Sequence, residues 1–264
     1  IIPERDIDKS PILECRHLGI DFGGLRAVND FNLTIGRTEI AGLIGPNGAG
    51  KTTIFNLLTK VYQHPGHILL DGLDTSGKTT AQINRMGIAR TFQNIRLFNN
   101  LSVEDNVKIG LHNQERYSAI TGVLRLPWYW SREKAAHERA LELLSLFGMA
   151  DLADHQPVPS LPRPAPAGDC PGPWPPIPSL LLLDEPAAGM NPSETAELME
   201  NIVKIRDTFQ IAVMLIEHDM KLVMSICEGI CVLNFGQVIA KGTAEEIQSN
   251  PAVIEAYLGK QKEA

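Results

Sequence analysis

The stretch that decides the fold is Gly45-Pro46-Asn47-Gly48-Ala49-Gly50-Lys51-Thr52, which fits the phosphate-loop pattern G-x-x-x-x-G-K-[ST]. Glycines let the backbone N–H groups of such a loop curl around a triphosphate, because no Cβ stands in the way. The lysine of the pattern reaches the β- and γ-phosphates, and the threonine hydroxyl reaches Mg²⁺. We therefore predict that these eight residues and the next one, Thr53, contact a nucleoside triphosphate.

The residues on either side of the loop support this interpretation. Residues 39–44 read as a short buried strand, and residues 53–58 read as the opening of a helix. The positive end of that helix would point at the phosphates. The alternative is a glycine-rich turn with a chance lysine, and the strand-loop-helix context disfavours it.

The composition bounds the class of protein. The 264 residues suffice for one large domain or two small ones, and 44% of them are hydrophobic. The net charge of −7, without a dense Lys/Arg run, speaks against nucleic-acid binding. No segment approaches about 18 consecutive apolar residues, so we expect no membrane span. The four cysteines form no C-x-x-C pair, which favours reduced thiols in a cytoplasmic protein.

Predicted strands alternate with predicted helices, which favours an α/β domain with a largely parallel sheet. The expected strands cover residues 12–20, 27–35, 67–72, 87–93, 180–184, 211–216, 230–234 and 237–240. The expected helices begin after Ser102 as N-cap, and cover residues 133–147 and 192–209.

Two acidic residues end the apolar run at 180–183. In a phosphate-loop protein an aspartate in the place of Asp184 holds Mg²⁺, directly or through water. Glu185 can orient or deprotonate the attacking water. The alternative is that both acids mark where a strand meets solvent, and the phosphate loop favours the catalytic interpretation.

Three more side chains are candidates on weaker grounds. His218 follows the strand at 211–216 and can contact the γ-phosphate, although a lone histidine is more often structural. Gln93 lies at a strand end before a polar loop, where it can ligate Mg²⁺ or position water. Phe22 can stack on adenine, and it can equally be an ordinary core aromatic.

Together these residues resemble the ATP-binding subunit of ABC transporters over nearly the whole chain. Residues 45–52 match the Walker A motif of that family, and residues 180–184 match Walker B. The resemblance further implies roles for Glu185 as the catalytic glutamate, Gln93 as the Q-loop glutamine, His218 as the switch histidine, Gly189-Met190-Asn191 as the D-loop and Phe22 as the A-loop aromatic.

The resemblance implies a fold and a set of ligands. We expect an α/β P-loop NTPase of ABC type, a single ATPase domain over residues 1–264 with a mixed sheet and a β-rich N-terminal part. Residues 1–93 and 180–264 would form the catalytic core, ending in a hairpin and a helix, and residues 94–165 a helical subdomain. ATP and Mg²⁺ are the implied cofactors, with Thr52, Gln93 and Asp184 as metal ligands.

The wording of two segments, 90–98 and 184–192, is similar to the ATPases of branched-chain amino acid importers. The insert at 112–132 and the ending at 254–259 are similar too. This implies an ATPase on the cytoplasmic face of the inner membrane, peripherally bound. Its partners would be a second ABC ATPase subunit, two membrane permease subunits and, indirectly, a periplasmic binding protein, with no nucleic acid. ATPases of lipopolysaccharide export or urea import are alternatives of similar build.

One segment departs from the family. ABC ATPases carry an LSGGQ-like signature that opens a helix before Walker B and binds the γ-phosphate of the nucleotide held by the opposing subunit. Here residues 160–166 hold that place, within a proline-rich segment at 157–178 in which ten of the 22 residues are proline. Prolines at this density exclude a helix. A nucleotide-binding but hydrolysis-defective protein is therefore a further alternative.

The departing segment is replaced rather than deleted, because Asp184 still stands 91 positions after Gln93. We therefore hypothesise a reading-frame error in this part of the gene. Codons that can encode residues 171–179, preceded by G and read with a one-base shift, can also encode Ala-Arg-Ala-Met-Ala-Thr-His-Pro-Glu. That peptide resembles the helix which leads into Walker B in the family.

Overall fold

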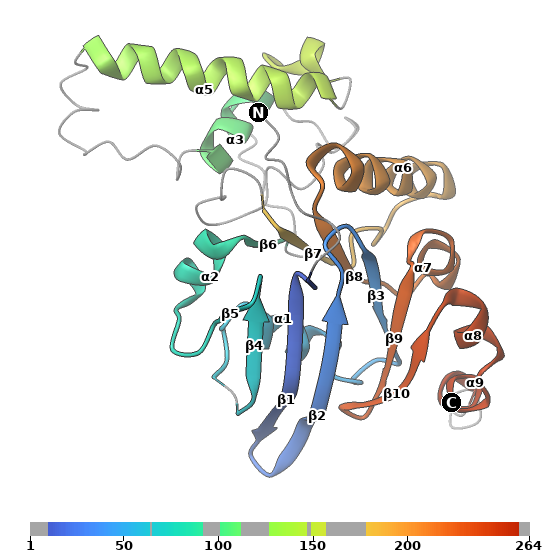
Figure 1. Cartoon of the computed structure of the whole chain (residues 1–264). Helices are drawn as coiled ribbons and strands as arrows, with labels where there is room; N and C mark the ends of the chain where they lie inside the picture. The colour runs from blue at the N-terminus through green and yellow to red at the C-terminus, as the bar shows by residue number, and fades with distance from the viewer. Residues whose placement is uncertain are drawn as a thin grey trace. The chain divides into compact units, whose positions relative to one another are not determined.

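The computed structural model describes residues 10–63, 65–91, 101–111, 127–146, 149–156 and 178–258 (Figure 1). The chain divides into two compact units. Residues 1–93 and 177–264 form the first, here called the core unit, and residues 94–176 form the second, here called the helical unit.

A six-stranded sheet runs through the core unit in the order β10-β9-β3-β8-β7-β6. Five of its strands run parallel to one another: β3 (Ile40–Ile44), β6 (Ile88–Arg90), β7 (Leu180–Asp184), β8 (Ala212–Ile216) and β9 (Gly229–Asn234). β10 (Gln237–Gly242) adds an antiparallel edge. β3, β7 and β8 are buried along their whole length, which explains their unbroken apolar sequences. The predicted largely parallel sheet is confirmed.

A second, antiparallel sheet of the core unit has the order β2-β1-β4-β5. β1 (Leu13–Phe22) and β2 (Leu25–Ile35) form a hairpin around Gly23 and Gly24, as predicted. β4 (His67–Leu70) pairs with β1, and β5 (Leu73–Asp74) pairs with β4. The expected β-rich N-terminal part and mixed-sheet α/β fold are thereby confirmed.

Four described helices of the core unit begin at a side-chain cap: α2 (Thr80–Met86), α6 (Pro192–Phe209), α7 (Met220–Ile226) and α8 (Ala244–Ser249). α6 begins with Pro192 in its first turn, and Asn191 and Glu194 form a reciprocal capping box before it. α2 has a similar box between Thr79 and Gln82. The other described helices are α1 (Lys51–Leu58) and α9 (Pro251–Leu258). α6 has the predicted bounds, whereas α2 and α7 were not predicted, and two helices, α8 and α9, follow the hairpin where one was expected.

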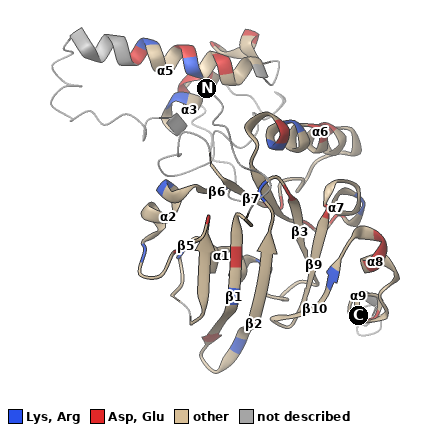
Figure 2. Cartoon of the chain, in the orientation of Figure 1, with Lys and Arg blue, Asp and Glu red and all other residues tan. Residues whose placement is uncertain are grey.

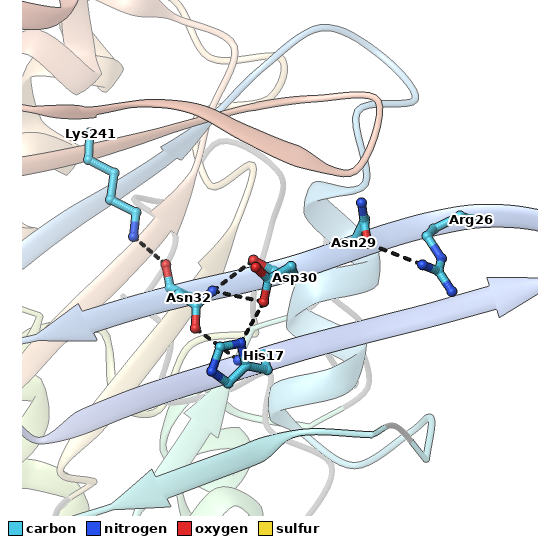
Figure 3. Close-up of polar contacts among 6 residues, drawn as sticks. All are labelled: His17, Arg26, Asn29, Asp30, Asn32 and Lys241. Atoms are coloured by element: carbon cyan, nitrogen blue, oxygen red, sulfur yellow. Dashed lines mark hydrogen bonds and ion pairs between the residues drawn. The ribbon is translucent and has the colours of Figure 1, made fainter.

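A polar cluster ties the two sheets of the core unit together (Figure 3). His17 on β1 and Asp30 on β2 both adopt the left-handed backbone conformation, with φ of 52° and 51°. Both lie where the pairing of the two strands shifts register. His17 Nδ1 lies 2.7 Å from Asp30 Oδ1, and Asn32 Nδ2 donates to Asp30 Oδ1 at 3.1 Å. These two hydrogen bonds, the first more than the second, hold the pKa of Asp30 below its usual range. Lys241 on β10 donates to the Asn32 carbonyl and so connects the six-stranded sheet to the antiparallel sheet.

The helical unit contains α3 (Val103–Leu111), α5 (Pro127–Leu146) and a short 3-10 turn, η2 (Ala150–Leu152). Its small core gathers buried apolar side chains from α3, from α5 and from the two residues that flank η2, namely Val103, Val107, Ala140, Leu144, Met149 and Ala153. Asp105 N–H donates to Ser102 Oγ at 3.0 Å, so the predicted N-cap is confirmed. Acidic and basic residues alternate along the described part of α5 (Figure 2). The helix predicted at 133–147 begins earlier, at Pro127, and proline suits the first turn of a helix because the N–H that it lacks has no partner within the helix there.

Three expectations concern thiols, membrane spans and the proline-rich segment. Cys15, Cys227 and Cys231 are buried and reduced, and burial raises the pKa of Cys227 and Cys231 to about 12, which keeps them protonated. Within the described ranges, no helix combines the length and apolar character needed to cross a bilayer.

Gln93, Cys170 and residues 157–177 lie outside the described residues.

Candidate nucleotide-binding site

The phosphate loop connects the end of β3 to the first residue of α1, as predicted. Two of its glycines are required by the packing. Gly45 has a φ of 153°, and a Cβ there would lie 2.1 Å from the carbonyl oxygen of Leu233. Gly50 has a φ of 104°, and a Cβ there would lie 2.8 Å from the carbonyl oxygen of Ala27. The loop is therefore held in a fixed shape by the backbone of β2 and β9.

Lys51 is the first residue of α1, and its side chain turns back into the loop. Its Nζ donates to Gly45 O at 2.7 Å and to Pro46 O at 3.1 Å, and the residue is buried. Thr52 is exposed and Thr53 is partly buried in the same first turn of the helix. Backbone N–H groups at a helix N-terminus attract anions, and the ammonium adds a full positive charge. The loop can thus receive a polyphosphate.

Asp184 ends β7 and is buried. Its carboxylate accepts a hydrogen bond from Arg90 Nη2 at 2.7 Å, from the neighbouring strand β6. Its backbone N–H lies 3.4 Å from Thr91 Oγ1. Since β7 and β8 lie between β3 and β6 in one sheet, Asp184 and the phosphate loop both follow carboxyl ends of parallel strands. In open α/β sheets this edge is where ligands bind.

Glu185 and His218 follow two adjacent strands, and the structure brings them together. His218 Nε2 lies 2.8 Å from Glu185 Oε1. Glu185 has a φ of 51°, an uncommon backbone conformation for a non-glycine residue. Its N–H donates to Ile216 O at 2.9 Å, which anchors the turn to the end of β8. The arrangement presents a carboxylate that a ring nitrogen holds in place, next to the strand end that carries Asp184.

Glu217 was missed by the sequence interpretation. It is buried between β8 and His218, and its Oε1 accepts a hydrogen bond from Ala187 N–H at 2.7 Å. Its Oε2 lies 3.1 Å from the backbone nitrogen of His218. Burial raises the pKa of Glu217, although these backbone donors act in the opposite direction. The residue fixes the turn after Glu185 to the segment that carries His218.

Comparison with known proteins gives the family. The family model described as ABC transporter matches residues 28–161. The chain belongs to the ABC transporter ATP-binding family. A second model, described as branched-chain amino acid ATP-binding cassette transporter, matches residues 237–263. The first match ends within the proline-rich segment, where the sequence departs from the family signature.

Relatives in this family match along nearly the whole chain. The high-affinity branched-chain amino acid transport ATP-binding protein BraF of Pseudomonas aeruginosa is 42% identical over 94% of this chain and 98% of its own length. LivG of Escherichia coli, which carries the same description, is 43% identical over 94% and 98%. An ATP-binding cassette of an ABC transporter, solved in its ADP conformation, superimposes with a TM-score of 0.77 at 23% identity, covering 95% of this chain and 100% of that one.

The family implies a Mg²⁺ ion beside the nucleotide, and the described residues fit one. Asp184 offers a carboxylate and Thr52 a hydroxyl, and oxygen ligands are those that Mg²⁺ prefers. In the described part of the chain, no three His, Cys, Asp or Glu side chains gather as a metal cage. Mg²⁺ is usually bound by one or two carboxylates together with substrate phosphates.

Phe22 and Gly189 are further predicted site residues that lie in the described part of the chain. Phe22 is 41% exposed, so the alternative of a core aromatic is wrong. Its ring meets Tyr62 edge to face, with centroids 5.1 Å apart. Gly189 has a φ of 77° in the turn before Asn191, which caps α6.

Tyr257 is a second residue that the sequence interpretation did not single out. It lies on α9, within the segment that matches the branched-chain amino acid family model. Burial raises the pKa of Tyr257, and a hydrogen bond with the Gly45 backbone partly offsets this. The C-terminal segment therefore places this phenol near the Gly45 backbone. A tyrosine at the end of an apolar helix was the available signal.

Proposed function

We propose that this chain is the ATP-binding and hydrolysing subunit that powers import of branched-chain amino acids through an inner-membrane ABC transporter. The observation that carries the proposal is the phosphate loop, packed into one conformation between β3 and α1, on the sheet edge that also carries Asp184, Glu185 and His218. The relatives named as branched-chain amino acid transport proteins support this substrate over lipopolysaccharide or urea.

Each side chain then has a chemical task. Residues 45–53 bind the phosphates, with Lys51 supplying the positive charge. Thr52, Asp184 and Gln93 hold Mg²⁺, which neutralises charge on the phosphates when bound. Glu185 orients the attacking water and accepts its proton, and His218 holds the carboxylate through Nε2. Phe22, with its partly exposed ring, stacks on the adenine.

Membership of the family supports the partners and the location that we propose. A second ABC ATPase subunit pairs with this chain head to tail, and two permease subunits bind the pair at the cytoplasmic face of the membrane. Residues 1–93 and 180–264 serve as the catalytic core, and residues 94–165 as the subdomain that contacts the permeases. The periplasmic binding protein acts through the permeases alone.

A hydrolysis-defective subunit is the second candidate, and one observation favours it. The ABC transporter family model stops matching at residue 161, inside the segment that replaces the signature. The signature completes the nucleotide site of the opposing subunit. In a heterodimer this chain would therefore keep its own site and fail to complete the site of its partner, because transition-state charge there would lack donors.

The test is transport by proteoliposomes that contain this chain, its co-encoded permeases and partner ATPase, and the binding protein. We expect ATP-dependent uptake of leucine that is lost when Glu185→Gln is introduced in this chain. Bound ATP without uptake, and with turnover lost at the site of the partner, would favour the hydrolysis-defective candidate. Absence of ATP binding would contradict both.

A further inference from the structure

Arg90 is held on three sides at the end of β6. Its Nη2 donates to Asp184 Oδ2 at 2.7 Å, and its Nη1 donates to Asn56 Oδ1 on α1 at 2.7 Å. The guanidinium carbon lies 5.5 Å from the centroid of the Phe55 ring. The side chains of Arg90 and Asp184 are 8% and 9% exposed. This buried ion pair thus joins the strand end at Asp184 to the helix that follows the phosphate loop.

The ion pair changes what Asp184 can attract. A buried carboxylate with no counter-ion is costly, and the guanidinium compensates its charge. The same positive charge repels a divalent cation that approaches the carboxylate, and this repulsion is poorly screened away from water. Lys51, buried at the start of α1, adds a second positive charge to the core of the loop. Before a nucleotide binds, these two positive charges therefore oppose the attraction of a cation to Asp184.

A bound triphosphate reverses this balance. Its charges add to Asp184 and outweigh those of Arg90 and Lys51, so that a cation is attracted only when the nucleotide is present. We propose that Arg90 is a positioning residue that makes divalent-cation binding at Asp184 conditional on the nucleotide. This inference rests on the proposed function, since it takes Asp184 as a metal ligand.

The test uses Mn²⁺ as the probe and nucleotide-free, full-length protein. Mn²⁺ is titrated into the wild type, Arg90→Gln, Arg90→Met and Arg90→Lys while free Mn²⁺ is followed by electron paramagnetic resonance. Glutamine keeps an N–H donor for Asp184 without charge, methionine removes both, and lysine keeps the charge. We expect both neutral variants to bind one Mn²⁺ at least about tenfold more tightly than the wild type. Arg90→Lys should stay close to the wild type.

Two results would overturn the inference. One is a folded neutral variant, with the wild-type circular dichroism spectrum, that binds Mn²⁺ no more tightly than the wild type. The other is a gain that persists in Arg90→Gln/Asp184→Asn, since the cation would then bind elsewhere. Binding of ATP with Mg²⁺ to the wild type is measured in parallel. Its absence would refute the proposed function, whereas its presence with unchanged Mn²⁺ affinities would refute this inference alone.

Discussion

His218 Nε2 lies 2.8 Å from Glu185 Oε1, although the two residues stand on different strand ends and 33 positions apart in the chain. The contact is set by the parallel pairing of β7 with β8, in which Asp184 stands opposite Ile216. One residue past the strand, the left-handed backbone at Glu185 turns its side chain toward the segment after β8. The register of the sheet thus positions the carboxylate of Glu185, the proposed catalytic base.

The Glu185–His218 contact makes a prediction about turnover. In the assembled transporter, Glu185→Gln in this chain should lower ATP turnover at its own site by about 10²–10⁴-fold, because a general base is lost. ATP affinity should remain close to that of the wild type. Phosphate release and nucleotide binding measure the two quantities. The control is Glu194→Gln, the same change in the exposed capping box of α6, where glutamine serves equally well. Turnover that both variants retain equally would contradict the role of Glu185.

The packing of the phosphate loop makes a prediction about stability. Gly45→Ala places a Cβ 2.1 Å from a backbone oxygen of β9, which cannot move away, so the free energy of unfolding should fall by about 3 kcal/mol or more. Gly48→Ala is the matched control. Its φ of 81° also disfavours alanine, yet nothing lies within 4 Å of the added Cβ. It should cost about 1–2 kcal/mol. Urea unfolding of both variants measures the difference, and equal midpoints would refute the packing argument.

Glu217 predicts a dependence of stability on pH. Its pKa is raised by burial above the ordinary 4.5, so the folded state keeps this proton to higher pH than the unfolded chain. Its contribution to stability is therefore complete below about pH 4.5 and is lost as the pH rises through the raised pKa. Glu217→Gln removes this titration. The free energy of unfolding of the wild type minus that of Glu217→Gln should fall between pH 4.5 and 7.5. A difference that rises over this interval would show that the pKa is lowered instead.

The proline-rich segment predicts a result at the level of the gene. If the reading frame is in error, resequencing across the codons for Pro157 to Leu180 should reveal a signature followed by a helix-forming sequence. Peptide mass spectrometry of the natural protein checks the same point independently. Recovery of a peptide with the sequence of residues 171–179 would refute the frame error and favour the hydrolysis-defective subunit.

Site residues could be predicted from the sequence wherever a short local pattern specifies their chemical role. The phosphate loop has its own motif, and Asp184, Glu185 and His218 each follow an apolar strand at once. Helix α2 also had a local signal, the Thr79 to Gln82 capping box, which went unused. The pattern of α7 was similarly available, since Asp219 caps it.

Contacts between distant segments could not be predicted in the same way. Arg90 meets Asp184 across 94 positions, and Ala187 meets Glu217 across 30. Both pairs depend on the strand order β8-β7-β6, and apolar runs do not specify which strands are neighbours. Glu217 also looked like part of a polar loop, because burial of a carboxylate becomes visible only when its backbone donors are in place.

The most direct test of the account is a calorimetric titration of ATP with Mg²⁺ into the wild type, Lys51→Met and Lys60→Met. Both lysines are buried on or next to α1, at its two ends, so the same substitution is made with and without contact to the phosphate loop. We predict one ATP per chain for the wild type, affinity at least about tenfold weaker for Lys51→Met, and near wild-type affinity for Lys60→Met. Equal affinities in all three proteins, or no ATP binding by the wild type, would contradict the assignment of residues 45–53 as the nucleotide site.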